Sequence, residues 1–145
     1  MKIVLDTNCL IPVLVPGSFG YDIWQAFRKG AYTLCVSSEI LLEYEEILIH
    51  MTGSREFSSL VVETILNAPN VERITPSYRF NLITADPDDN KFVDCAITAG
   101  ATYIVSNDRH FNELKRYDFP LTIPRNSVSV FTSTWGKSYR FSSLK

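Results

Sequence analysis

Short apolar runs alternate with helical segments along this chain, and that alternation limits its fold more than any other feature. Strands are predicted at residues 2–5, 32–36, 71–74, 103–106 and 121–123. Helices are predicted between them, after Thr7 and at 21–28, 37–50, 57–68, 90–99 and 109–115. Strands that alternate with helices build a mainly parallel sheet with helices on both faces. We therefore expect a three-layer α/β/α fold.

Length and composition indicate one ordinary globular domain. The chain has 145 residues, a size typical of a single domain, and no run approaches the ~20 apolar residues of a membrane span. A strand pattern follows Met1 and Lys2 directly, without a secretory leader. We expect one domain over residues 1–145, with a variable tail from about residue 125, located in the cytoplasm without a membrane.

The cysteines agree with a reducing compartment. There are three, an odd number without a C-x-x-C pair: Cys9, Cys35 and Cys95. Each has apolar neighbours, so we expect small buried side chains rather than disulfides. The two histidines match no zinc-ligand spacing.

Charge is distributed unevenly. Residues 1–108 carry 7 Lys and Arg against 14 Asp and Glu, whereas residues 109–145 carry 7 against 2. An acidic body with a basic C-terminal third suits a metal site beside a phosphate-bearing substrate. Composition alone fits an ordinary solvated surface equally well.

Two acids follow predicted strands. Asp6 comes directly after Ile3-Val4-Leu5, and Asp108 follows Tyr103-Ile104-Val105 with Ser106 two residues before it. A carboxylate at the carboxyl end of a parallel strand lies where open α/β sheets bind ligands. Either aspartate could instead cap the helix that follows it.

Two further acids border the apolar stripes of predicted helices. Glu43 borders one stripe and Glu45 its opposite edge, so periodicity does not choose between them. Asp94 and Asn90 share an edge of a later helix, one turn apart, whereas Asp89 is interpreted as the N-cap of that helix. A solvated glutamate, and a salt bridge from Asp94 to a lysine, are the simpler alternatives. Clustered carboxylates usually hold a hard cation such as Mg²⁺ or Mn²⁺.

These motifs together resemble a PIN domain. The resemblance covers roughly residues 1–124. In chain order, its motifs are Asp6-Thr7-Asn8, Ser38 with Glu43, Asp86-Pro87-Asp88-Asp89-Asn90-Lys91 before Asp94, and Ser106-Asn107-Asp108. Each motif is weak alone, but their order and spacing are fairly specific. The chain is most similar to the VapC-like subgroup, the toxin components of toxin–antitoxin systems.

The resemblance implies a metal-dependent ribonuclease that binds one or two Mg²⁺ or Mn²⁺ ions. Asp6, Glu43 and Asp108 match the first, second and last acids of the family. The usual third position falls on Asn90, and members of the subgroup often carry an acid one turn later, which matches Asp94. The expected catalytic set is therefore Asp6, Glu43, Asp94 and Asp108, with Asn90 assisting. From Arg125 onward the chain departs from the family's usual short ending.

The expected activity is hydrolysis of RNA phosphodiester bonds. Asp6, Asp94 and Asp108 would hold the metal ion, and Thr7 and Ser106 would support carboxylates or water. Weaker candidates for contact with the RNA backbone are Arg109, His110, Lys115 and Arg116. The expected partners are RNA, an antitoxin protein and a possible second copy of the chain.

Two other functions compete with this one. A phosphatase of the haloacid dehalogenase type also places an aspartate after its first strand, but it needs a second one where this chain has Asn8. A catalytically weak PIN-like module that binds RNA or protein is the stronger alternative, because Asn90 replaces a carboxylate.

Overall fold

The computed structural model describes residues 1–18, 20–116 and 121–123. Five strands form one sheet in the order β3-β2-β1-β4-β5, with every neighbouring pair parallel. The strands are β1 (Lys2–Leu5), β2 (Thr33–Val36), β3 (Val71–Arg73), β4 (Tyr103–Val105) and β5 (Leu121–Ile123). The predicted α/β fold with a mainly parallel sheet is confirmed.

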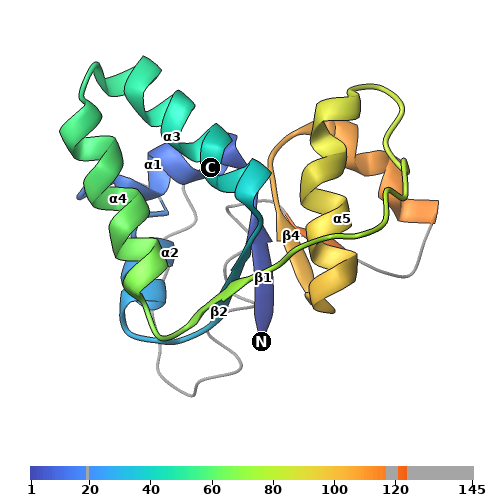
Figure 1. Ribbon diagram of the computed structural model, residues 1–145, viewed down its shortest axis with the longest axis horizontal. Coiled ribbons are helices and arrows are strands. Elements are labelled where there is room, and N and C mark those ends of the chain that lie inside the picture. Colours follow the sequence, from blue (N-terminus) through green and yellow to red (C-terminus); the bar gives the residue numbers. More distant parts are fainter. Residues whose placement is uncertain (19, 117–120, 124–145) are drawn as a thin grey trace.

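Helices cover the sheet on both sides. The α-helices are α1 (Thr7–Leu14), α2 (Tyr21–Arg28), α3 (Ser38–Thr52), α4 (Arg55–Asn67) and α5 (Asn90–Ala99). Two 3-10 segments complete the described elements, η1 (Pro87–Asp89) and η2 (Arg109–Arg116). Figure 1 shows α1 to α4 gathered on one side of the strands and α5 on the other, packed on β1, β2 and β4.

Local sequence explains the bounds of the helices. The side chain of Ser37 accepts a hydrogen bond from Ile40 N–H at the start of α3, and Ser54 does the same for Phe57 N–H in α4. Gly53 and Gly100 end α3 and α5 with positive φ angles of 68° and 66°, a conformation that glycine adopts without strain. Pro12 lies inside α1.

The core lies between the sheet and its helices. The central strand β1 buries Ile3, Val4 and Leu5 completely or nearly so, as expected for a parallel strand covered on both faces. All three cysteines are buried and reduced, as the sequence predicts. In the described part of the chain, no helix is both long and apolar enough to cross a bilayer.

The order of the strands creates a switch point between β1 and β4. From β1 the chain moves outward to β2 and β3, and from β4 it moves outward to β5 on the other side. The carboxyl ends of two strands at such a point border the crevice in which open α/β sheets bind ligands. Asp6 and Ser106 directly follow the paired residues Leu5 and Val105 at this crevice.

Candidate active site

Asp6 is a buried carboxylate at the switch point. Its N–H donates to Val105 O at 3.0 Å, which continues the pairing of β1 with β4. Its Oδ2 accepts a hydrogen bond from Ser106 Oγ at 2.7 Å, and only 3% of the residue is exposed. Asp6 occupies the N-cap position of α1, but its side chain makes no capping hydrogen bond. The backbone N–H of Asn8, in the first turn of α1, nevertheless lowers the pKa of this carboxylate, so Asp6 interacts with the start of the helix as well as with Ser106.

Asp108 is joined to Asp6 through one serine. The N–H of Asp108 donates to Ser106 Oγ at 2.9 Å, while the same hydroxyl donates to Asp6. Asp108 Oδ1 also accepts from His110 N–H at 2.9 Å, so this side chain does cap the turn that begins η2. Ser106 thus holds the two strand-end acids in a fixed relation, the supporting position predicted for it.

Asp89 brings a third carboxylate to this crevice. It precedes α5 but makes no side-chain capping bond there; its Oδ2 lies 3.1 Å from His110 Nδ1 instead. That nitrogen is also 3.3 Å from Asp108 Oδ1, so His110 connects Asp89 with Asp108. Ligand atoms of Asp86, Asp89 and His110 all lie within 4.8 Å of one another. We call Asp6, Asp86, Asp89 and Asp108 the acidic cluster.

The charges of neighbouring acids contribute to the raised pKa values of two members of the acidic cluster. Burial raises the pKa of Asp6, and the negative charges of Asp108 and Glu43 raise it further, against the hydrogen bond from Ser106. Burial also raises the pKa of Asp89 to about 6, with contributions from the charges of Asp108, Asp86 and Asp6. Mutual repulsion of this kind is relieved when a cation binds between the carboxylates.

Glu43, on α3, lies beside the acidic cluster and connects it to two other elements. Its Oε2 accepts a hydrogen bond from Thr7 Oγ1, and its Oε1 lies 2.9 Å from Lys91 Nζ. Glu45 is exposed, so the structure favours Glu43 over Glu45 as the inward-facing acid of α3. Burial lowers the pKa of Lys91, but the hydrogen bond and charge of Glu43 raise it overall.

Asp94 is placed differently from its predicted position. Its Oδ1 accepts a hydrogen bond from Phe80 N–H at 3.0 Å, and the side-chain charges that act on it are those of Arg79 and Glu39. It lines a separate pocket whose lining includes none of Asp6, Asp89 and Asp108. The structure therefore does not bring Asp94 together with Asp6 and Asp108. The helical turn from Asp89 to Asp94 explains the difference, because it directs the two side chains to different faces of α5.

Asn90 has a structural contact instead of a place in the acidic cluster. Its Oδ1 accepts from Ile83 N–H at 2.9 Å, and its Nδ2 donates to Ile83 O at 2.8 Å. Both polar atoms of this amide are thus committed to the segment that precedes α5. The residue that carries the third carboxylate into the crevice is its neighbour, Asp89.

The four basic candidates divide into two groups. Arg109, Lys115 and Arg116 are exposed on η2, which agrees with either a solvated surface or contact with a polyanion. His110 is half-buried and contacts two carboxylates of the acidic cluster. Its sequence position beside Asp108 gave no sign of its contact with Asp89, 21 residues earlier.

Glu113 is a further residue that the sequence did not single out. Its carboxylate accepts hydrogen bonds from the N–H groups of Thr84 and Ala85 at 2.9–3.1 Å and from Thr84 Oγ1 at 3.0 Å. These bonds lower the pKa of Glu113 and hold the segment that leads directly into Asp86. Only the approach of η2 to residues 84–85 in three dimensions reveals this contact.

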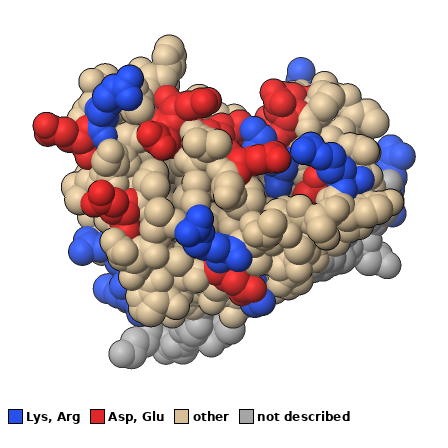
Figure 2. All heavy atoms as spheres, in the orientation of Figure 1, with Lys and Arg blue, Asp and Glu red and all other residues tan. Residues whose placement is uncertain are grey.

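The donor set suits a divalent cation. Carboxylate oxygens dominate the acidic cluster, and hard cations such as Mg²⁺ and Mn²⁺ prefer oxygen ligands. His110 Nδ1 is already engaged with Asp89 and Asp108, which suits an imidazole that orients carboxylates. In Figure 2, acidic side chains gather around a notch in the upper outline of the molecule, between α3 and α5.

Comparisons with known proteins identify the family and agree with the fold. The family model for the PIN domain matches residues 2–110. A search of curated proteins found no matching sequence. Among solved structures, the fold resembles a chain in the crystal structure of VapBC2 from Rickettsia felis bound to a DNA fragment from their promoter. That match has 18% sequence identity and a TM-score of 0.59, and it covers 86% of this chain and 98% of the other. Because the family model spans most of the sequence, the chain belongs to the PIN domain family.

Proposed function

We propose that the protein is a metal-dependent ribonuclease, with Mg²⁺ or Mn²⁺ as the ion. The observation that carries this proposal is the placing of Asp6 and Asp108 at the carboxyl ends of β1 and β4, linked through Ser106, with ligand atoms of Asp86, Asp89 and His110 within 4.8 Å of one another and His110 in contact with Asp108. Three carboxylates held together by a serine and a histidine are costly without a cation and favourable with one. Membership of the PIN family points to nuclease chemistry for such a site.

The ion would be held by Asp6, Asp89 and Asp108, with Asp86 at the edge of the site. When bound, it would lower the pKa of a coordinated water and offset charge on the scissile phosphate. Asp89 replaces Asp94 in the set that the sequence predicts, because Asp89 lies beside Asp108 and Asp94 does not line the same crevice. Asn90 keeps a structural role rather than an assisting one.

The remaining residues orient this set. Ser106 holds Asp6 and the backbone of Asp108, and His110 separates Asp89 from Asp108 at fixed distances. Thr7 and Lys91 hold the carboxylate of Glu43, which can then accept a proton from water. Lys91 places a positive charge beside the acids, where a substrate phosphate needs one.

We further propose that the protein is the toxin of a toxin–antitoxin pair. The structural neighbour comes from a VapBC2 complex, so a partner protein is the expected regulator. Several apolar side chains on α3 and α4 are exposed and available for contact with a partner: Leu42, Met51, Phe57, Leu60 and Leu66. Light scattering of the purified chain distinguishes a monomer that needs this partner from a homodimer.

A cleavage assay on a mixed RNA panel tests the activity. We expect endonucleolytic products with Mg²⁺ or Mn²⁺, none with EDTA, and none from Asp6→Asn or Asp108→Asn. Glu46→Gln is the matched control, because it removes one exposed carboxylate of α3 and should cleave normally. Tight RNA binding without cleavage under every metal condition would favour the alternative, a catalytically weak binding module.

A further inference from the structure

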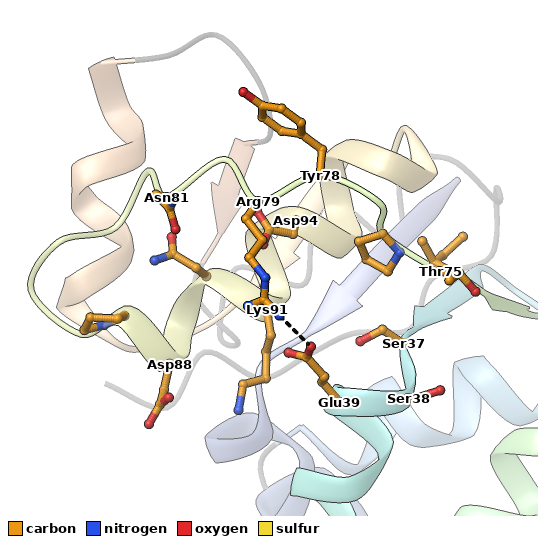
Figure 3. Close-up of a pocket in the computed structure, with 14 residues that line it drawn as sticks. Ser37, Ser38, Glu39, Thr75, Tyr78, Arg79, Asn81, Asp88, Lys91 and Asp94 are labelled. Atoms are coloured by element: carbon orange, nitrogen blue, oxygen red, sulfur yellow. Dashed lines mark ion pairs between the residues drawn. The ribbon is translucent and has the colours of Figure 1, made fainter.

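A polar pocket lies beside the acidic cluster and takes no part in the chemistry described above. It has a volume of about 400 Å³, within the range of small-ligand sites. Its walls come from the start of α3, the segment after β3 and the first turns of α5, as Figure 3 shows. We call it the side pocket. Lys91 lines it and also contacts Glu43, so the side pocket adjoins the proposed active site.

Asp94 is the most unusual group in the side pocket. Only 7% of the residue is exposed, yet the single hydrogen bond described for its carboxylate is the one that Phe80 N–H donates to Oδ1. Among the described residues, Oδ2 accepts none. A carboxylate buried to this degree normally has its acceptors satisfied. Oδ2 is therefore available, within the side pocket, to accept a hydrogen bond from a bound molecule.

Arg79 supplies the complementary charge at the mouth of the side pocket. It lies 3.7 Å from Glu39 Oε1, and both side chains are mostly exposed (Figure 3). An exposed ion pair of this kind contributes little to stability, so Arg79 can leave Glu39 for a ligand at small cost. Its charge opposes the rise in the pKa of Asp94 that burial causes, and both side chains line the side pocket.

An exposed aromatic side chain lies at the same rim, with its ring directed outward from Arg79 and Asp94 (Figure 3). Tyr78 is 65% exposed and lines the side pocket, and its ring is 4.7 Å from that of Phe80. Exposed aromatic rings beside a polar pocket are typical of sites that stack an unpaired base of single-stranded RNA. The adjoining active site would then receive the phosphate that follows this base.

We propose that the side pocket binds one unstacked guanine of a single-stranded RNA substrate. Guanine carries an acceptor, O6, next to two donors, N1–H and the 2-amino group. Arg79 matches the acceptor and Asp94 matches the donors, whereas uracil offers Asp94 only one donor. The proposal rests on the proposed ribonuclease function, for which it names a base preference.

Nucleotide binding without metal tests this separately from cleavage. The protein is titrated in EDTA with guanosine 5′-monophosphate and with uridine 5′-monophosphate. Binding is followed by calorimetry or by the amide NMR signals of Phe80 and Lys91. The two nucleotides carry the same phosphate, so the comparison isolates the base. We expect guanosine monophosphate to bind at least about tenfold more tightly, because charged hydrogen bonds contribute that much or more. Equal affinities, or no binding of either nucleotide, would overturn the proposal.

Single substitutions test which residues give the preference for guanine. Asp94→Asn should remove it, whereas Glu46→Gln, with the same change of charge on an exposed part of α3, should keep it. Arg79→Met gives a second test at a mostly exposed side chain, where folding is not in question, and should also remove it. Asp6→Asn should keep the preference while abolishing cleavage, which separates failure of the pocket from failure of the active site. Displacement of the nucleotide by an equal concentration of methylguanidine would instead assign the pocket to a basic side chain of a partner protein and overturn the proposal.

Discussion

At the residue scale, the acidic cluster is arranged for ligand binding rather than for stability. Asp6 and Asp89 are buried, and the negative charge of Asp108 contributes to the raised pKa of each. Repulsion among these groups opposes folding unless a cation joins them. Ser106 donates to one oxygen of Asp6, and His110 contacts one oxygen each of Asp89 and Asp108, so these contacts offset only part of that cost.

The first prediction concerns Asp6→Asn. The amide oxygen can still accept from Ser106, while the charge that repels Asp108 and Glu43 is lost. We therefore expect the melting temperature in EDTA to stay the same or rise, although cleavage is lost. A scan of thermal unfolding measures this. A clear drop in melting temperature would mean that Asp6 stabilises the fold through its charge, as a helix cap would.

The second prediction concerns the pH dependence that Asp89 imposes. Its pKa is about 6 in the folded protein and near 3.8 in the unfolded chain, so the folded state holds the proton more tightly. The stability of the metal-free protein should therefore fall as pH rises from about 4 to about 6, and Asp89→Asn should flatten this slope. Melting temperatures across that range in EDTA measure it. If the stability of Asp89→Asn depends on pH as steeply as that of the parent protein, the proton that is bound on folding belongs to another group.

At the element scale, the active site depends on segments that approach one another from distant parts of the chain. Residues 84–89 connect the segment after β3 with α5 and carry Asp86 and Asp89 into the crevice. The described contacts that hold this segment include those from Glu113 on η2 to Thr84 and Ala85 and from Asn90 to Ile83. Glu113 thus positions the acids without contacting the reacting groups.

The third prediction follows from that position. Glu113→Gln keeps the size of the side chain but weakens its hydrogen bonds to Thr84 and Ala85, which loosens the segment that carries Asp86 and Asp89. We expect weaker metal binding by about 10-fold, a typical loss for residues that orient metal ligands. Glu63→Gln, an exposed position on α4, is the control. Calorimetric titration measures the Mn²⁺ affinity of both variants. Equal affinities would mean that Glu113 does not position the metal ligands.

The same scale explains which features the sequence predicts. Hydrophobic periodicity, capping serines and glycines at helix ends are local signals, so the strands and helices fall within a few residues of their predicted bounds. The strand-end acids Asp6 and Asp108 follow from the parallel sheet itself. The third acid does not, because the choice among Asp89, Asn90 and Asp94 depends on how the first turn of α5 is rotated against the sheet. From the sequence, Asp89 is interpreted as the N-cap of this helix, and that interpretation does not predict its contact with His110.

At the scale of the whole molecule, the hydrophobic core and the charged crevice of the proposed active site occupy different parts of the fold. The buried strands and the helices on both faces form the body, and the charged residues of the crevice lie at the carboxyl edge of the sheet. The expected variable tail from about residue 125 lies outside the described residues, as does most of the basic C-terminal third, so their parts in RNA binding remain predictions.

The fourth prediction concerns stabilisation by metal. A cation that binds only the folded protein should stabilise it by about 2.7 kcal/mol at a concentration 100 times its dissociation constant. This corresponds to a rise of several degrees in the melting temperature. The combined variant Asp6→Asn, Asp89→Asn and Asp108→Asn should show no rise. Differential scanning calorimetry with and without Mn²⁺ measures the effect, and an equal rise in the combined variant would place the ion outside the acidic cluster.

Anomalous diffraction from a crystal soaked in Mn²⁺ tests the central claim most directly, because it locates the ion without reference to activity. We expect a manganese peak at the carboxyl ends of β1 and β4, within bonding distance of carboxylate oxygens from Asp6, Asp89 and Asp108. A peak coordinated by Asp94 in the side pocket, with none between Asp6 and Asp108, would contradict it.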